Sequence, residues 1–240
     1  MQFFAKSQKF DLLDVEKYKY DSGLIFSSYG ILRGNGEIIK KSKDYIYLDH
    51  GFFNSSKRRF AENMQTKVNS LNGYFRVIKN DLYFNQNFNE IDKNRFLKLN
   101  ITLEKPVKNG EYIILSEPSL NTLEFNKISE WTNNTCEELK KFTDRKIIIH
   151  NKFSKVPLTA LLNRAYAFVS YQSTAGFLSI IKGVPSFFTH ESLKKHGNIK
   201  DIENVSLNYN LLYLAANSQW KLSEFFSNEF NEYLANLLDT

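Results

Sequence analysis

The chain has 240 residues, of which 42% are hydrophobic and 24% charged, which is typical of a soluble globular protein with one large domain or two small ones. Its net charge of +6 favours an anionic partner such as a nucleotide, a nucleic acid or an anionic lipid surface. The single cysteine excludes an intrachain disulfide framework and a thiolate zinc site, and it fits a reducing cytoplasm. No stretch approaches the roughly 20 apolar residues that a membrane span needs, so we expect none.

The region up to about Lys108 is irregular and rich in Asn, Lys and Tyr. It predicts strands over 24–27, 45–48 and 73–78, with a helix over 29–41 between the first two. A strand, a crossover helix and a second strand indicate parallel pairing. The third strand alternates between apolar and polar residues, so we expect one of its faces to be exposed to solvent.

The rest of the chain alternates between strands and helices. Strands are predicted over 111–115, 146–150, 167–170 and 184–188, and helices over 123–142, 157–162 and 173–182. This order predicts a doubly wound parallel sheet, in which the β-branched run at 146–150 is covered on both faces. A last helix is expected over 222–237, capped by Ser218 or Ser223. We therefore divide the chain into an N-terminal α/β region, 1–108, and a Rossmann-like region with a closing helix, 109–240.

Ligands of such sheets bind at the carboxyl ends of the strands. After the strand at 167–170, a run of small residues opens a helix, and free N–H groups at a helix N-terminus bind phosphate readily. The alternative is that Ser173 or Thr174 is only a structural N-cap. The predicted anion site comprises Ser170, Gln172, Ser173, Thr174, Ala175 and Gly176.

His150 and Lys152 follow what we take to be the neighbouring strand, where Lys152 would place a cation on a diphosphate. Asp49 and His50 end an N-terminal strand and are candidates for accepting a proton from a hydroxyl; the alternative is a turn with a satisfied histidine. Arg76 either faces an anionic ligand or pairs with an acid. No Walker, dinucleotide-binding or nucleophile-elbow motif is present, which argues against P-loop kinases, dinucleotide dehydrogenases and α/β-hydrolases.

The segment 161–188 resembles the donor-binding half of GT-B glycosyltransferases, in which a strand ends in Ser or Thr, small polar residues open a helix, and Gly-x-Pro precedes the next strand. The corresponding residues here are Ser170, 173–175 and 183–185. Two further segments, Tyr-Leu-Asp-His-Gly at 47–51 and Gly-Tyr-Phe-Arg-Val-Ile-Lys-Asn at 73–80, are similar to segments of phage-encoded glycosyltransferase-like proteins. The likeness covers most of the chain, although the N-terminal half is short for a full acceptor domain.

This resemblance implies a GT-B-like α/β fold with two Rossmann-like halves, both with parallel sheets, the N-terminal half being reduced. It implies a metal-independent glycosyltransferase in the cytoplasm (the host cytoplasm if phage-encoded), a monomer or weak dimer without a tightly bound cofactor. A nucleotide sugar, in the first place a UDP-sugar, would be the co-substrate, and double-stranded DNA with a hydroxymethylated base is a possible acceptor. The alternatives are a cell-surface polysaccharide acceptor, a lipid-linked acceptor, an epimerase of the same architecture, and a non-catalytic nucleotide- or nucleic-acid-binding module.

Glu191 joins the donor site, although it lies late for the carboxylate that many GT-B enzymes place on the ribose. The acceptor side comprises Arg33, Arg76, Lys57 and Arg58.

Overall fold

The computed structural model describes residues 2–11, 25–55, 59–60, 67–68, 72–83, 91–204 and 206–239 of the chain. The chain forms two compact units. The first comprises residues 1–99 and 213–240, and the second comprises residues 100–212. The helix α9 (Asn210–Asn217) spans the boundary at Leu212.

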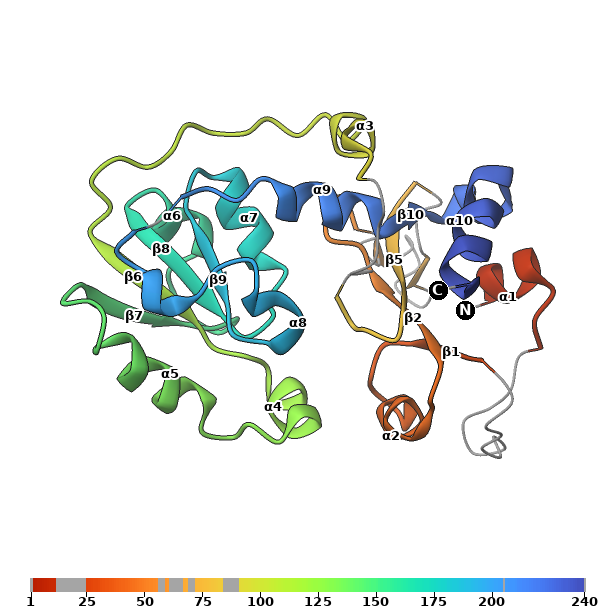
Figure 1. Cartoon of the computed structure of the whole chain (residues 1–240), viewed down its shortest axis with the longest axis horizontal. Helices are drawn as coiled ribbons and strands as arrows, with labels where there is room; N and C mark the ends of the chain where they lie inside the picture. Colours follow the sequence, from red (N-terminus) through yellow and green to blue (C-terminus); the bar gives the residue numbers. More distant parts are fainter. Residues whose placement is uncertain are drawn as a thin grey trace. The chain divides into compact units, whose positions relative to one another are not determined.

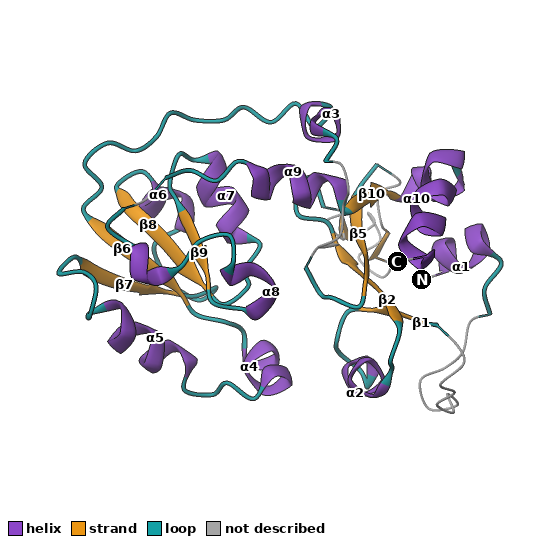
Figure 2. Cartoon of the chain, viewed as in Figure 1, coloured by secondary structure: helices purple, strands orange, loops and turns teal. Residues whose placement is uncertain are grey.

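The second unit contains one fully parallel sheet, as the alternation of strands and helices predicts (Figure 2). Its strands are β6 (Tyr112–Ser116), β7 (Lys146–His150), β8 (Ala165–Ser170) and β9 (Ser186–Phe188), in the spatial order β7-β6-β8-β9. The central strands β6 and β8 read as nearly continuous apolar runs because both of their faces are covered.

Helices cover both faces of this sheet, so it is doubly wound (Figure 1). On one face, α4 (Leu120–Asn126) and α5 (Trp131–Leu139) pack on β6 and β8 through Leu123, Trp131 and Leu139. On the other face, α6 (Leu158–Leu162) and α7 (Ala175–Ile181) pack through Leu162 and Leu178. The short helices α8 (Glu191–Lys194) and η2 (Ile199–Asp201) follow β9.

Two expectations for this unit are wrong. The helix expected over 123–142 is two helices, because Lys127 takes a left-handed conformation with φ of 56° and ends α4. Its N–H donates to the carbonyls of Leu123 and Glu124, which closes the helix. The strand 146–150 is not covered on both faces either: β7 is an edge strand, and Ile149 is 50% exposed.

The first unit contains a mixed sheet of the order β1-β2-β5-β10. The strands β1 (Phe26–Tyr29) and β2 (Tyr45–His50) are parallel and are joined through α2 (Asn35–Lys41), as predicted. However, β5 (Tyr74–Lys79) is antiparallel to β2 and to β10 (Gln219–Lys221). The expectation of parallel sheets in both halves is therefore wrong for the first unit. A separate antiparallel pair is formed by β3 (Arg59–Phe60) and β4 (Lys67–Val68).

Helices from both ends of the chain cover one face of this mixed sheet. They are α1 (Gln2–Gln8), η3 (Leu222–Phe226) and α10 (Asn228–Asp239), and their core includes Phe4, Phe225 and Phe230. The closing C-terminal helix thus packs with the N-terminal unit, whereas the sequence division at 108/109 assigned it to the second. Its N-cap is Ser227, whose Oγ accepts the N–H of Phe230, and neither Ser218 nor Ser223 fills this role.

The strand β5 is buried on both faces, which contradicts the expected exposed face. Tyr74, Arg76 and Ile78 on one face are buried, and so are Phe75 and Val77 on the other. The helix α3 (Lys93–Leu97) adds Phe96, which packs edge-on against Phe53. No helix in the described part of the chain is long and apolar enough to cross a membrane.

Candidate functional site

The parallel sheet of the second unit has its topological switch point between β6 and β8. From β6 the chain moves outward to β7, then crosses back over β6 to β8 and continues to β9. Ligands of open α/β sheets bind in the crevice at the carboxyl ends beside such a point. Here Ser116 of β6 and Ser170 of β8 are register partners, so the segments that follow them flank the candidate site.

The strand order changes which side chains border this point. His150 ends β7, and β6 lies between β7 and β8. With strands about 4.8 Å apart, His150 and Lys152 start roughly 10 Å from the end of β8 rather than beside it. The expectation that they follow the neighbouring strand is therefore wrong. The His150 ring lies 3.1 Å from the carbonyl of Val156 through Nε2, and the exposed Lys152 lies over the ring of Phe153.

The turn after β8 is held by its own hydroxyls. Ser170 is fully buried, and its Oγ accepts the N–H of Ser173 at 3.3 Å. The Oγ of Ser173 accepts the N–H of Ala175, and the carbonyl of Ser173 accepts the N–H of Gly176. Among the described residues, nothing accepts the N–H of the exposed Thr174. Ser173 therefore caps the turn, and Thr174 retains the N–H that is available to a ligand.

Gly176 faces the core of the second unit. A Cβ at this position would lie 2.4 Å from Cζ of Phe188, which is itself buried. The glycine thus allows α7 to pack closely on β9. Ala175 packs in the core on the same side of the sheet. Of the small residues predicted to admit a phosphate, these two serve helix–sheet packing.

Gln172 and Glu117 lie beside the switch point and carry polar side-chain atoms. Oε1 of Gln172 is buried and has no hydrogen-bond partner in the described part of the chain. Glu117, directly after β6, accepts the amide N–H of Asn151 at 2.9 Å and a longer bond from Thr132 at 3.4 Å. Glu117 is absent from the predicted site residues, although its position after a predicted central strand is the signal that could have identified it.

Aromatic rings extend the site along the carboxyl ends of β8 and β9. Tyr171 makes edge-on contacts with Trp131 and His190, with ring centroids 6.1 and 5.1 Å away. Burial raises the pKa of Tyr171, and the charge of Glu191 acts in the same direction. Glu191 is exposed in the first turn of α8 and pairs with Lys194.

In the first unit, Asp49 belongs to a buried ion pair. Its Oδ2 accepts hydrogen bonds from Nη2 of Arg76 and from the hydroxyl of Tyr47, both at 2.8 Å, and its Oδ1 accepts the N–H of His50. Burial alone would raise the pKa of Asp49, but the Arg76 charge and these hydrogen bonds hold the pKa below its ordinary value. A carboxylate so stabilised is a weak proton acceptor.

His50 is free of these constraints. Its ring is exposed, lies 3.3 Å from the Tyr29 hydroxyl through Nε2, and stacks on Phe75. Asp49 contacts the backbone of His50 and not its ring, so the pair does not form a carboxylate–imidazole dyad. Of the two predicted bases, His50 is the one whose side chain is exposed and lies outside the ion pair.

Arg76 lies in a polar row across three strands. Asp49, Arg76 and Gln219 are consecutive register partners on β2, β5 and β10, so their side chains share one face of the sheet. Arg76 also donates to the carbonyl of Leu82 and lies within 5.2 to 5.8 Å of three aromatic rings. Nε of Arg76 and Nε2 of Gln219 are buried donors that have no partner among the described residues.

The other predicted acceptor residues are Arg33, Lys57 and Arg58. Arg33 is exposed, with a left-handed φ of 57°, in the loop before α2. Lys57 and Arg58 lie outside the described residues. In the described ranges, no group of three or more His, Cys, Asp or Glu side chains is placed to hold a metal ion.

Comparison with known proteins adds no family to this description. No protein-family model matches the chain, and no curated protein matches its sequence.

Proposed function

We propose that the protein is a glycosyltransferase that binds a nucleotide-sugar donor at the carboxyl edge of the parallel sheet. The observation that carries the proposal is the switch point between β6 and β8, because Glu117 directly follows β6 and Gln172 and Thr174 follow β8. The Thr174 N–H suits a phosphate oxygen, and the carboxylates of Glu117 or Glu191 suit ribose hydroxyls.

In the proposed reaction, an acceptor hydroxyl attacks the anomeric carbon of the donor sugar. The bond from that carbon to the diphosphate oxygen breaks, and the nucleoside diphosphate leaves with the bonding electrons. The hydroxyl proton passes to a general base. Of the two predicted candidates, His50 has an exposed ring, whereas both oxygens of Asp49 accept hydrogen bonds. The first acceptor to be tested is a hydroxymethylated base in double-stranded DNA, because the chain carries a net charge of +6.

Nucleotide binding is tested by thermal shift with UDP, GDP, ADP and their glucose conjugates. A ligand at about 100 times its Kd stabilises the protein by about 2.7 kcal/mol. We expect one nucleotide diphosphate to raise the melting temperature and Gln172→Ala to abolish that shift. Because Oε1 of Gln172 has no partner in the free protein, its loss should leave the unliganded melting temperature almost unchanged. Asn163→Ala, an exposed amide in the same unit, is the matched control. If no nucleotide shifts the melting temperature, the donor site is wrong.

Transfer is tested with a radiolabelled nucleotide sugar and either hydroxymethylated DNA or a polysaccharide. His50→Asn should abolish transfer and leave the nucleotide-dependent shift intact. Transfer to the polysaccharide alone would contradict the DNA acceptor and keep the enzyme class. Binding without transfer to any acceptor, in the unaltered protein, would instead favour a non-catalytic nucleotide-binding module.

A further inference from the structure

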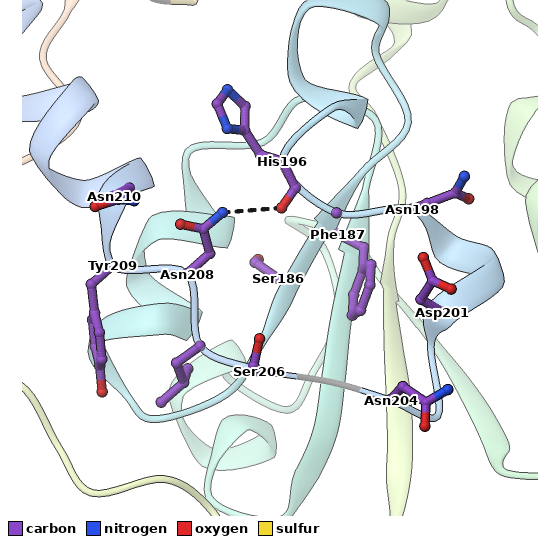
Figure 3. A pocket seen from close by; sticks show the side chains of 12 residues that line it. Ser186, Phe187, His196, Asn198, Asp201, Asn204, Ser206, Asn208, Tyr209 and Asn210 are labelled. Carbon is purple, nitrogen blue, oxygen red and sulfur yellow. Dashed lines mark hydrogen bonds between the residues drawn. The ribbon is translucent and has the colours of Figure 1, made fainter.

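A polar cavity of about 440 Å³ lies beside the outer edge of β9, within the second unit. Small-molecule sites typically occupy about 300–1,000 Å³. Figure 3 shows its lining: Phe187 comes from β9, Asp201 from η2, and Asn208 and Tyr209 from the loop before α9. None of these residues belongs to the switch-point site described above.

The edge of β9 supplies backbone groups to this cavity. In a parallel sheet, successive residues of a strand direct their N–H and C=O groups alternately to the two sides. Pro185 and Thr189 bond to β8 through the carbonyl of Pro185 and the N–H of Thr189. Ser186 and Phe188 therefore direct their backbone groups outward, to the open side of this edge strand. The hydroxyl of Ser186 is engaged with that of Ser179 at 2.9 Å.

The opposite wall is fixed in place. Nδ2 of Asn208 donates to the carbonyl of His196 at 3.1 Å, which ties the loop before α9 to the loop after α8. Asn198 caps η2 by accepting the N–H of Lys200. Among the described residues, Oδ1 of Asn208, Nδ2 of Asn198 and the side chains of Asn204 and Asn210 make no other hydrogen bond.

The charge of the lining selects against anions. No Lys or Arg lines the cavity among the described residues, and Asp201 is the lining residue with a formal negative charge. Burial lowers the pKa of His196, with the charge of Lys195 acting in the same direction, so its ring is neutral at pH 7. An apolar ligand would take the amides out of water without giving them hydrogen-bond partners, which is unfavourable.

From this lining we propose that the cavity binds a neutral saccharide. Vicinal sugar hydroxyls each donate and accept, as do the amides of Asn198, Asn204, Asn208 and Asn210. The Asp201 carboxylate accepts from two hydroxyls, and the Tyr209 ring offers a surface for the apolar face of a pyranose. This site is independent of the proposed glycosyltransferase activity, which uses the carboxyl ends of β6 and β8.

Saturation-transfer difference NMR on the full chain tests the proposal with glucose, galactose, mannose and N-acetylglucosamine as probes. At least one of them should give a transfer signal that titrates to saturation, whereas glucuronate and glucose 6-phosphate should bind at least tenfold more weakly. Asp201→Ala and Asn204→Ala alter two exposed side chains that make no hydrogen bond within the described part of the chain, and each should weaken binding of the neutral sugar at least tenfold. Asn163→Ala, an exposed amide outside the cavity, should bind as the unaltered protein does.

The proposal fails if no neutral sugar gives a signal, if the anionic sugars bind as well as the neutral ones, or if both cavity variants retain full binding. Its failure is distinguishable from that of the proposed function. The nucleotide-dependent thermal shift should persist in Asp201→Ala, and the saccharide signal should persist in Gln172→Ala.

Discussion

At the scale of single residues, the ion pair between Asp49 and Arg76 explains why a charged residue occupies a buried strand. The Arg76 side chain is 11% exposed and that of Asp49 is 24% exposed, and their closest atoms are 2.8 Å apart. Taking one partner away leaves a buried charge without compensation, which typically costs about 3–5 kcal/mol. The pair therefore holds β2 and β5 together on the polar face of the sheet.

We predict that Asp49→Asn lowers the free energy of unfolding by about 3 kcal/mol at pH 7, as measured by urea denaturation. The matched control is Glu37→Gln, which breaks the exposed pair with Lys40 in the same unit and should cost less than about 0.5 kcal/mol. Equal effects of the two substitutions would contradict a buried, structural role for Asp49.

The difference in unfolding free energy between the unaltered protein and Asp49→Asn depends on pH, because the pKa of Asp49 is lowered in the folded state. A carboxyl whose folded pKa is below its unfolded value of about 3.9 contributes stability that is fully present above that value. This contribution is lost as the pH falls through the folded pKa. The gap in unfolding free energy between the unaltered protein and Asp49→Asn should therefore be constant from pH 7 to about pH 5 and shrink below about pH 4. A gap that widens on acidification would refute the assignment.

At the scale of elements, the sequence predicts most of the strands because buried runs such as Ile113–Leu115 have few alternatives to a central strand. It does not reveal the break at Lys127. Leu123, Ile128 and Leu139 pack against the same core whether the helix is continuous or interrupted, so the periodicity continues across the break. No glycine marks the left-handed position, since Lys127 itself occupies it.

The candidate site is predictable from sequence only where it depends on one strand end. The turn from Ser170 to Gly176 directly follows β8, so the apolar run of that strand and the small residues after it predict where the turn lies. Lys152 was placed wrongly because a series of crossovers defines parallel pairing but does not define which strands are neighbours. The roles of Ser173 and Gly176 depend on atoms of Ser170, Ala175 and Phe188, which no sequence pattern reveals.

The left-handed residue at the break between α4 and α5 predicts the sign of a change in unfolding free energy. Lys127→Gly should raise the free energy of unfolding by up to about 1 kcal/mol, because a left-handed conformation costs a residue with a Cβ about 1–2 kcal/mol. Lys140→Gly, at a C-cap with a right-handed conformation and φ of −60°, should destabilise by up to about 1 kcal/mol. Chemical denaturation measures both. Were α4 and α5 one continuous helix, Lys127→Gly would destabilise as well.

At the scale of the whole molecule, the chain returns to its first unit after completing the second. Residues 213–240 supply β10, η3 and α10 to the unit that contains α1. The sequence gives no sign of this return, because an amphipathic helix shows that it packs on a surface and not which surface it packs on. The division at 108/109 therefore misplaced the tail, whose Phe225, Phe230 and Leu234 belong to the core of the first unit.

The two tryptophans of the chain allow this division to be tested, because Trp220 lies in the first unit and Trp131 in the second. Phe230 is fully buried beside Trp220, and its truncation to Ala should cost about 3–5 kcal/mol. We predict that Phe230→Ala lowers the denaturant midpoint reported by Trp220 fluorescence in a Trp131→Phe background. The midpoint reported by Trp131, in a Trp220→Phe background, should change far less. Phe168→Ala, in the core of the second unit, should give the opposite pattern. If both reporters shift together in both variants, the two units unfold as one cooperative domain; if Phe230→Ala shifts only Trp131, the C-terminal helix stabilises the second unit.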